Sequence, residues 1–196
     1  MKLGITGVFG SGKTTVAKLI AKHGYKHINA DEVGHKLLDK KSIKEKIIKK
    51  FGKKILTNNR INRAKLKRIV FNHHNKLVKL NKIIHPSIIK EIKSIIKNSK
   101  NKKIIVDGAL LIEAKCQNLF DKLIVVKINK KEQLRRALKK KKYTKQEMYN
   151  IISSQLPQKE KLKYADIIVD NSGSLEKTKK QVDRILRKLN KWDKNV

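Results

Sequence analysis

Short apolar runs alternate along the chain with apolar residues at helical spacing. Between the first two runs, Val16, Leu19 and Ile20 fall at i, i+3 and i+4, which is the spacing of one helix face. Strands that alternate with helices favour an α/β fold with a five-stranded parallel sheet covered on both faces. The apolar runs predict the strands at residues 2–6, 25–30, 103–107, 123–128 and 166–169.

Residues 40–103 carry an almost wholly helical pattern. We expect Asn62 to cap the second of these helices and Pro86 to lie in the first turn of the last. His85 directly precedes Pro86, so it either caps that helix or contacts a substrate. A helical insertion of this size between two strands is suited to covering a second substrate. Its apolar stripes begin at Ile43, Leu66, Leu77 and Ile88.

The segment between the first strand and the first helix reads Gly-Val-Phe-Gly-Ser-Gly-Lys-Thr, the G-x-x-x-x-G-K-[ST] pattern of a phosphate-binding loop (P-loop). Glycines let successive N–H groups point at phosphate oxygens, and the following helix directs its positive end at the same anion. Lys13 can reach the β- and γ-phosphates, and the Thr14 hydroxyl can bind Mg²⁺. The motif predicts a nucleoside triphosphate site formed by Gly10, Ser11, Gly12, Lys13, Thr14 and Thr15.

Two later segments extend the predicted site. The strand at residues 103–107 ends in Asp107, a Walker-B pattern that places a carboxylate near Mg²⁺. The segment at residues 134–142 is strongly basic and leads into a second helix at residues 144–154. This basic segment is either a solvated helix end or a lid that closes cations over a triphosphate.

The charge of the chain favours anionic ligands. Lys and Arg number 51 against 16 Asp and Glu, a formal net charge of +35. Only 7 of the basic residues are Arg, the lysines are spread along the chain, and aromatic residues are few. We therefore do not expect nucleic acid to be the main partner.

The length of the chain and its number of cysteines limit which classes of protein it can belong to. The 196 residues suit one domain, and the single Cys116 excludes an intramolecular disulfide. No apolar stretch approaches the ~18–20 residues that span a bilayer, and a strand begins at once at the N-terminus, leaving no room for a signal peptide. We therefore expect a cytoplasmic protein.

Among P-loop proteins, the motifs favour a kinase of a small molecule. A GTPase needs a glycine where Leu110 stands and an N-K-x-D motif, which here ends in Glu132. A large motor ATPase needs a longer chain. Two alternatives stay open: another small-molecule or nucleotide kinase on the same scaffold, and a basic P-loop ATPase that binds nucleic acid.

An ordered set of motifs resembles the dephospho-coenzyme A (dephospho-CoA) kinase family over nearly the whole chain. The family's G-[LI]-T-G-x-x-G-S-G-K-[ST]-T opening matches residues 4–15, and D-A-D-x-[IV] matches residues 29–33 except at Asn29. The other matches are N-R-x-x-L-x-x-x-V-F at 62–71, I-x-H-P at 83–86, D-x-P-L-L-x-E at 107–113, Q-x-P at 155–157 and D-N-S-G at 170–173. Departures from the family's pattern, which concern acceptor and ATP recognition, are Asn29 for Asp, His35 for Arg, Ala109 for Pro, Lys140 for Arg and Ile151 for Arg.

The resemblance implies transfer of the ATP γ-phosphoryl group to the ribose 3′-hydroxyl of dephospho-CoA, the last step of coenzyme A synthesis. It implies that Mg²⁺ is held by Thr14 and Asp107 and that Asp31 orients and deprotonates the acceptor hydroxyl. It further implies that Arg136 and Lys140 close on the triphosphate, while Asn171 borders the adenine through backbone groups and thus helps to bind ATP.

The resemblance also implies a fold and an assembly. The fold is the three-layer α/β/α fold of P-loop NTPases in a single kinase domain. Its core spans residues 1–34, 101–137 and 158–196, with a helical acceptor-binding insertion at about 35–100 and a lid at about 138–157. The expected partners are ATP and dephospho-CoA, without a membrane, and the expected assembly is a monomer or a small homo-oligomer.

Overall fold

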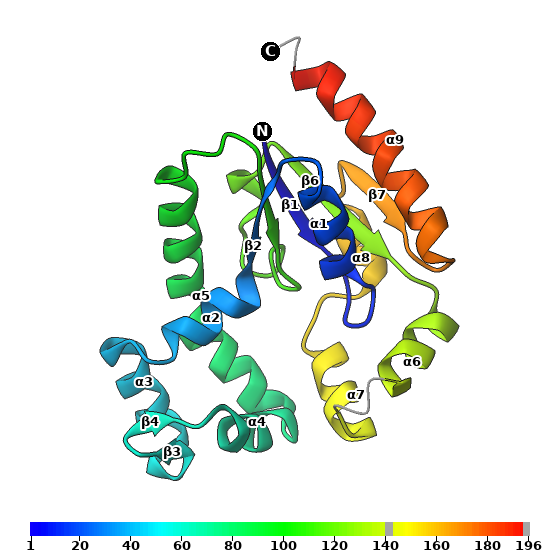
Figure 1. Cartoon of the computed structure of the whole chain (residues 1–196). Helices are drawn as coiled ribbons and strands as arrows, with labels where there is room; N and C mark the ends of the chain where they lie inside the picture. The colour runs from blue at the N-terminus through cyan, green and yellow to red at the C-terminus, as the bar shows by residue number, and fades with distance from the viewer. Residues whose placement is uncertain (140–142, 194–196) are drawn as a thin grey trace.

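The computed structural model describes residues 1–139 and 143–193, and its centre is one parallel sheet (Figure 1). The sheet has five strands in the order β2-β5-β1-β6-β7, and every neighbouring pair is parallel. The predicted α/β fold with a five-stranded parallel sheet is therefore confirmed. The strands are β1 (Lys2–Thr6), β2 (Lys26–Asn29), β5 (Ile104–Asp107), β6 (Lys122–Lys127) and β7 (Ile167–Asp170).

The register of the sheet brings several chain segments to one edge. Asp107 at the end of β5 pairs with Ile5 of β1 on one side and with Asn29 of β2 on the other. The segments that follow these strands therefore leave the sheet at the same level. β1 lies between β5 and β6, so the chain runs to both sides of it. In open parallel sheets, ligands bind outside the carboxyl ends of the strands at such a point.

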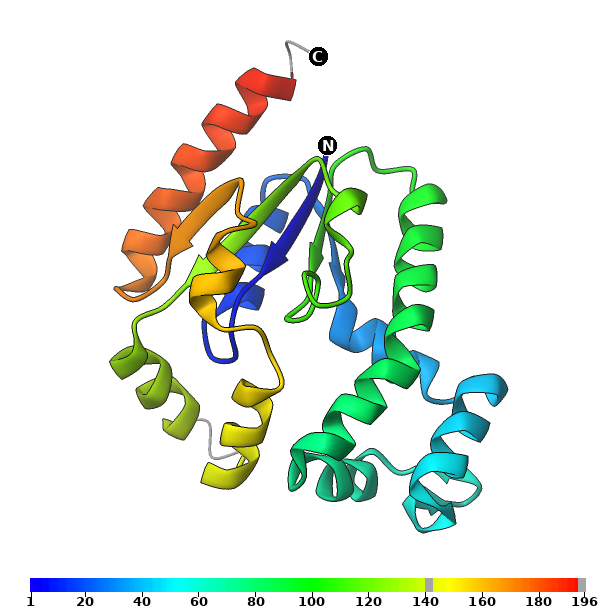
Figure 2. The ribbon, with the colours of Figure 1, turned by 180° about the vertical axis from the view of Figure 1, so that it is seen from behind.

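Helices cover both faces of the sheet and give three layers. α1 (Lys13–Ala21) and α9 (Leu175–Asp193) cover one face, whereas α8 (Gln158–Leu162) and part of α5 (His74–Lys97) lie on the other (Figures 1 and 2). The apolar residues buried between the first two helices and the sheet include Val16, Ala17 and Ile20 of α1 and Val182, Leu186 and Leu189 of α9. The core on the opposite face includes Ile28, Ile92, Val106 and Leu111.

The insertion between β2 and β5 is helical as predicted, but it also contains a hairpin that was not expected. Asn62 caps α4 as predicted, because its Oδ1 accepts hydrogen bonds from the amides of Ala64 and Lys65. The hairpin turns at Asn58 and Asn59, whose φ angles are +47° and +57°, a conformation that suits Asn. The elements are α2 (Ala30–Leu37), α3 (Lys41–Phe51), the 3₁₀ turn η1 (Lys53–Ile55), β3 (Leu56–Thr57), β4 (Arg60–Ile61), α4 (Arg63–Phe71) and α5.

The prediction that Pro86 begins a helix is wrong, because α5 is one helix of 24 residues with Pro86 inside it. His85 therefore does not cap a helix start. The two apolar stripes that were predicted to begin at Leu77 and Ile88 lie along the same face of α5. Leu77, Ile84 and Ile92 are buried on this face. The exposed Pro86 lacks an N–H and leaves the Lys82 carbonyl without its helical donor, a cost that the packing of this face outweighs.

The segments after β5 and β6 complete the fold. Thr144 begins α7 with a capping box in which its hydroxyl accepts from the Glu147 amide, as the expected helix at residues 144–154 requires. α7 packs on the insertion, since Asn150 Nδ2 donates to the carbonyl of Phe71 at 2.7 Å. α8, which was not predicted, begins after Pro157. The elements here are the 3₁₀ turn η2 (Gln117–Leu119), α6 (Lys130–Lys139), α7 (Lys145–Ser153) and α8.

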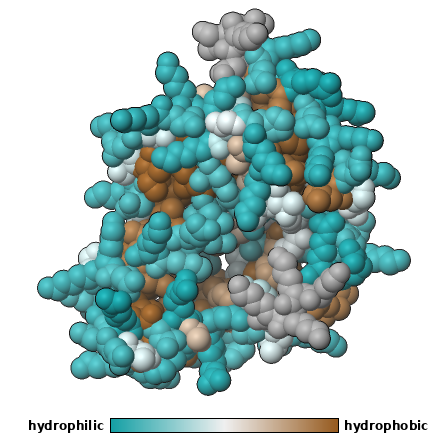
Figure 3. Space-filling view, in the orientation of Figure 1, coloured by the Kyte–Doolittle hydropathy of each residue, from teal (hydrophilic) through white to brown (hydrophobic). Residues whose placement is uncertain are grey.

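The surface is mainly hydrophilic. Figure 3 shows hydrophilic side chains over most of one face and a hollow near its centre, between the sheet and the insertion. Among the described helices, none combines the length and the apolar character needed to cross a bilayer.

Candidate active site

The P-loop at residues 7–14 joins β1 to α1 and has the geometry of an anion cradle. Gly10 and Gly12 adopt φ angles of +81° and +82°, which side chains rarely tolerate. Gly12 is the N-cap of α1, and no described side chain makes a capping hydrogen bond there. The first amides of α1 are therefore left for a ligand, and the helix dipole favours a negatively charged one.

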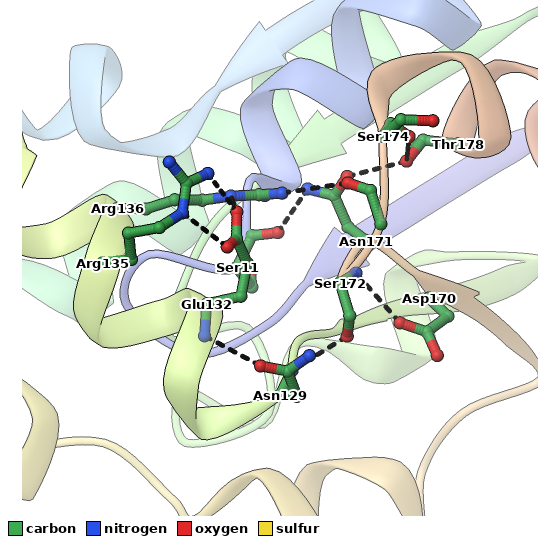
Figure 4. A network of polar contacts seen from close by, with 11 residues as sticks. Ser11, Asn129, Glu132, Arg135, Arg136, Asp170, Asn171, Ser172, Ser174 and Thr178 are labelled. Carbon is green, nitrogen blue, oxygen red and sulfur yellow. Dashed lines mark hydrogen bonds and ion pairs between the residues drawn. The ribbon is translucent and has the colours of Figure 1, made fainter.

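A chain of buried polar groups fixes the backbone of the P-loop from behind (Figure 4). Asn171 Nδ2 donates to the Ser11 carbonyl at 2.7 Å, and the Thr178 hydroxyl donates to Asn171 Oδ1 at 2.8 Å. A Cβ atom on Gly12 would lie 2.2 Å from Asn171 Nδ2, so the glycine is needed for this approach as well as for its φ angle. Asn171 thus supports the P-loop through its side chain.

The tip of the P-loop is held from two further sides. Gln133 of α6 donates to the Phe9 carbonyl at 2.7 Å, and the Phe9 amide donates to Gln155 Oε1 at 2.9 Å. Gln155 precedes α8 and is part of the Q-x-P sequence. The loop is therefore preformed, because its backbone groups at the tip are bound to side chains on both sides.

Arg136 projects from α6 towards the P-loop. Its Nε donates to Glu132 at 2.6 Å, and its Nη2 lies 3.4 Å from the Gly173 carbonyl. Its Nη1 is 3.5 Å from the position that a Cβ on Gly12 would occupy. Arg136 therefore lies beside the predicted phosphate site, whereas Lys140, the other expected lid cation, lies outside the described residues.

Asp107 supplies a buried carboxylate next to the P-loop. Only 1% of the residue is exposed, and neither oxygen has a hydrogen-bonding partner of good geometry among the described residues. Burial raises the pKa of this carboxyl, and the neighbouring Thr14 hydroxyl and Lys13 ammonium oppose that shift. His27 Nε2 lies 3.7 Å from Asp107 Oδ2, beyond hydrogen-bond distance. A carboxylate without a hydrogen bond beside a hydroxyl suits a hard divalent cation such as Mg²⁺. Within the described chain, no group of three or more His, Cys, Asp or Glu is placed to hold a metal, so few protein ligands are available.

Asp31 lies in the first turn of α2, near Asp107. The exposed Asp31 is close enough that its charge raises the pKa of Asp107, although burial is the larger cause. The charge of Asp31 also raises the pKa of Tyr143, for which burial is again the larger cause. Asn29, at the end of β2, caps α2 by accepting from the amides of Asp31 and Glu32 at 2.9 and 3.2 Å.

A model of the dephospho-CoA kinase family matches residues 1–177. The chain belongs to the dephospho-CoA kinase family. A dephospho-CoA kinase of Fusobacterium nucleatum subsp. nucleatum is 41% identical over 185 residues, covering 94% of this chain and 96% of that protein. A dephospho-CoA kinase of Carboxydothermus hydrogenoformans is 40% identical over 195 residues, covering 97% of this chain and 94% of that protein. The structure of a dephospho-CoA kinase from Campylobacter jejuni aligns with a TM-score of 0.69 at 30% identity, over 98% of this chain and 100% of that one.

Membership of the dephospho-CoA kinase family confirms the expected family, the P-loop α/β fold and the kinase class. The structure brings the P-loop, Asp31, Asp107, Arg136 and Asn171 together at the carboxyl edge of the sheet. The roles of these residues stay predictions. Thr15 is exposed in the first turn of α1.

Sequence reasoning did not predict the buried contacts around Glu113. Lys161 of α8 is fully buried and donates to Glu113 at 2.7 Å and to the Ala109 carbonyl at 2.8 Å. His85 lies near the same carboxylate, and burial lowers the pKa of its imidazole despite the opposing charge of Glu113. Only the position of Lys161 shortly after the Q-x-P sequence could have drawn attention to it. A lysine is ordinarily expected to be exposed to solvent.

An aromatic group between the P-loop and the insertion was also missed. Tyr143 stacks edge-on against Phe9 with ring centroids 5.4 Å apart and lies 5.9 Å from the ring of Phe71. Lys67 Nζ lies 4.3 Å from the centroid of the Tyr143 ring. Ile151 is buried in α7, so hydrophobic packing occupies the position at which the family pattern has Arg.

Proposed function

We propose that this chain transfers the γ-phosphoryl group of ATP to the ribose 3′-hydroxyl of dephospho-CoA at the hollow between the P-loop and the insertion. ATP-dependent phosphorylation of dephospho-CoA is the activity of the family to which the chain belongs. The observation that carries the proposal is the convergence of Lys13, Thr14 and Asp31 on the buried Asp107. Phosphoryl transfer needs mainly positioning and charge stabilisation, and this group supplies both.

The P-loop side of the hollow would hold the donor. The amides of the P-loop and Lys13 bind the β- and γ-phosphates. Thr14 and Asp107 would hold Mg²⁺, and this assignment is supported by the lack of a hydrogen bond to either oxygen of Asp107. When bound, Mg²⁺ neutralises charge on the phosphate oxygens. Arg136, beside Gly12, adds positive charge, and Lys140 is proposed to do so from the lid.

The opposite side of the hollow would hold the acceptor. Asp31 stands at the N-terminus of α2 across from the P-loop, which suits a carboxylate that orients the 3′-hydroxyl and accepts its proton. The insertion at about residues 35–100 would bind the rest of dephospho-CoA, and the lid at about 138–157 would close over the donor. We further propose that the enzyme works in the cytoplasm, as a monomer or a small homo-oligomer.

An acceptor panel tests the proposal. With ATP and Mg²⁺, we expect dephospho-CoA to be converted to coenzyme A, measured by ADP release and by mass spectrometry, and nucleoside monophosphates to react far more slowly. Lys13→Ala should nearly abolish turnover with an unchanged melting temperature, because the half-buried loop lysine contributes little to packing.

Two results would overturn the proposal. A nucleoside monophosphate that reacts faster than dephospho-CoA would assign another acceptor to the same scaffold. ATP hydrolysis that depends on added nucleic acid, without phosphorylation of any small acceptor, would favour a nucleic-acid-binding ATPase.

A further inference from the structure

Glu132 of α6 binds two arginines with one carboxylate (Figure 4). Its Oε1 accepts from Arg135 Nη2 and from Arg136 Nε, both at 2.6 Å, and its Oε2 accepts from Arg135 Nε at 2.7 Å. Arg135 is thus held by two bonds in the forked geometry that suits a carboxylate. Arg136 binds Glu132 only through Nε, so its Nη groups are turned away from Glu132, and Nη2 donates to the Gly173 carbonyl at 3.4 Å.

The two arginines differ in what their remaining donors meet. The side chain of Arg135 is 61% exposed, whereas that of Arg136 is 25% exposed. Arg136 Nη1 and Nη2 lie between Gly12 of the P-loop and the carbonyl of Gly173. An ordinary ion pair between residues i and i+4 of a helix points both side chains into solvent. The Glu132–Arg136 pair instead places Nη1 beside Gly12 of the P-loop, while Nη2 donates to the Gly173 carbonyl.

The backbone that carries Glu132 is itself fixed to the sheet. The Glu132 amide donates to Asn129 Oδ1 at 2.8 Å, which caps the start of α6. The Asn129 amide donates to the Ser172 hydroxyl at 2.9 Å, in the loop after β7. One residue further along α6, Gln133 is bound to Phe9. Glu132 is therefore held in a fixed position relative to both the P-loop and the loop after β7.

We propose that Glu132 is a positioning residue that holds the Arg136 guanidinium with its Nη1 group beside the P-loop, where the phosphates of the donor bind. This inference rests on the proposed function, in which Arg136 contacts the triphosphate. An unrestrained Arg side chain has many rotamers, and Glu132 selects the one that faces the site before ATP arrives. Hydrogen bonds from Arg135 and Arg136 lower the pKa of the Glu132 carboxyl to about 2, so the carboxylate stays ionised at neutral pH.

Three single variants test the proposal by steady-state kinetics with dephospho-CoA. Arg136→Ala should lower kcat/KM for ATP by about 10²-fold, the usual loss when one charge-stabilising donor is removed. Glu132→Gln, which keeps the shape but not the charge, should lower it by roughly tenfold through misplacement of Arg136. Arg135→Ala is the matched control, because it removes the exposed partner of the same carboxylate, and it should stay within about threefold of wild type.

Chemical rescue separates positioning from a merely structural role. Guanidinium ion should restore part of the activity of Arg136→Ala, because a carboxylate remains to bind and orient it. The same ion should restore much less in the double variant Arg136→Ala/Glu132→Gln. Melting temperatures are measured in parallel, and the loss of kcat/KM should exceed what the fraction of unfolded protein explains. If Glu132→Gln does not fold, Glu132→Asp keeps the charge with a shorter reach and should also lose kcat/KM.

The possible failures are distinguishable. Wild-type kcat/KM in Arg136→Ala would overturn the role of Arg136 in the proposed function. A loss in Arg136→Ala with no loss in Glu132→Gln, or equal rescue with and without Glu132, would overturn the positioning role of Glu132 alone. A drop in melting temperature for Glu132→Gln with unchanged kcat/KM would show that the carboxylate only stabilises α6.

Discussion

At the scale of single residues, the side-chain amide of Asn171 has an orientation that its neighbours fix. The Ser11 carbonyl can only accept a hydrogen bond, so the NH₂ group of Asn171 must face it. The Oδ1 atom then faces the Thr178 hydroxyl, which donates. Asn171 and Thr178 are 4% and 0% exposed, so water cannot easily replace either partner. The P-loop conformation thus depends on a residue at the far end of the chain.

Asn171→Asp should weaken ATP binding. The substitution keeps the shape, removes the donor and sets a carboxylate against the Ser11 carbonyl. An unsatisfied buried acceptor costs about 1–3 kcal/mol. If this whole cost falls on the conformation of the P-loop that binds ATP, the Kd for ATP rises roughly 5- to 150-fold. Calorimetric titration with ATP measures the effect. Thr178→Ser keeps the hydroxyl and is the control, which should bind ATP like wild type. Wild-type affinity in Asn171→Asp would contradict the argument.

Asn29 shows how a departure from the family pattern is accommodated. The pattern has Asp at this position, and the amide oxygen of Asn29 performs the capping that either residue can perform. The cap fixes the first turn of α2 and with it the place of Asp31. The carboxylate of an Asp is therefore not needed for the local structure.

Asp31→Asn tests the acid–base assignment. The substitution keeps the first turn of α2 but removes the group that would accept the proton, so kcat should fall by about 10²–10⁴-fold. The Kd for ATP should change much less. Glu32→Gln, in the same turn and also exposed, is the control and should keep its kcat. If ATP binding is lost while bound complexes still turn over, Asp31 serves the metal rather than the acceptor.

At the scale of elements, a buried ion pair joins α8 to the segment after β5. Lys161 Nζ has all three donors bound, to both carboxylate oxygens of Glu113 at 2.7 and 2.8 Å and to the Ala109 carbonyl. Glu113 also accepts from the Leu156 amide at 2.8 Å. The Ala109 carbonyl accepts in addition from the Thr6 hydroxyl of β1 at 3.2 Å. The pair therefore connects α8, the chain after β5 and the end of β1.

Lys161→Met should strongly destabilise the protein. Removal of one partner of a buried pair leaves Glu113 uncompensated and costs about 3–5 kcal/mol in the free energy of unfolding. Lys163 offers a matched control, because it pairs with Glu160 at the same 2.7 Å but is 61% exposed. Lys163→Met should cost less than about 1 kcal/mol. Urea unfolding at pH 7 measures both, and equal small effects would refute the assignment.

The elements that the sequence predicted are those with long, periodic apolar patterns. Strands and the long helices follow from such patterns, and the P-loop follows from contiguous residues. The β3–β4 hairpin has strands of two residues each, too short for any alternation to be visible. The break expected at Pro86 was overridden by packing along one face of α5. α8 has only five residues and little apolar pattern.

The supporting side chains of the site could not be predicted for a different reason. Asn171 and Ser11 are 160 residues apart, and Lys161 and Glu113 are 48 apart. Such contacts depend on the order of strands in the sheet, which local spacing does not encode. In the sequence, Glu132 is notable only as the residue at which the N-K-x-D motif of GTPases fails. Its spacing from Arg135 and Arg136 is common in helices, so it gave no sign of a role in the site.

At the scale of the whole molecule, the acidic residues are few, and only some of them lie at the candidate site. Of the 16 Asp and Glu residues, Asp31, Asp107, Glu113 and Glu132 surround or support the phosphate site. Hydrophilic side chains cover most of the face in Figure 3 rather than one stripe. The lysines are spread along the chain, and a charge spread in this way attracts nucleotides generally, whereas nucleic-acid recognition favours a clustered basic face. That nucleic acid is not the main partner stays a prediction.

The molecule divides into the sheet with its covering helices and the insertion with α7 packed on it (Figures 1 and 2). His74 at the start of α5 meets Ser153 of α7 at 3.2 Å, and Asn150 of α7 binds the end of α4. α5 runs from this lower part to the sheet, where Ile92 packs in the same core as Val106 of β5. The same helix therefore belongs to both parts.

Pro86, near the middle of α5, sets the mechanical compliance of this connection. A helix bends most easily where a backbone hydrogen bond is missing, and α5 lacks one at the Lys82 carbonyl. A force applied to the lower end of α5, for instance by an acceptor pulling the insertion towards the P-loop, concentrates curvature at this turn. We expect the half of α5 that packs on the sheet to stay straight, so Asp107 and the P-loop should keep their spacing if the insertion moves.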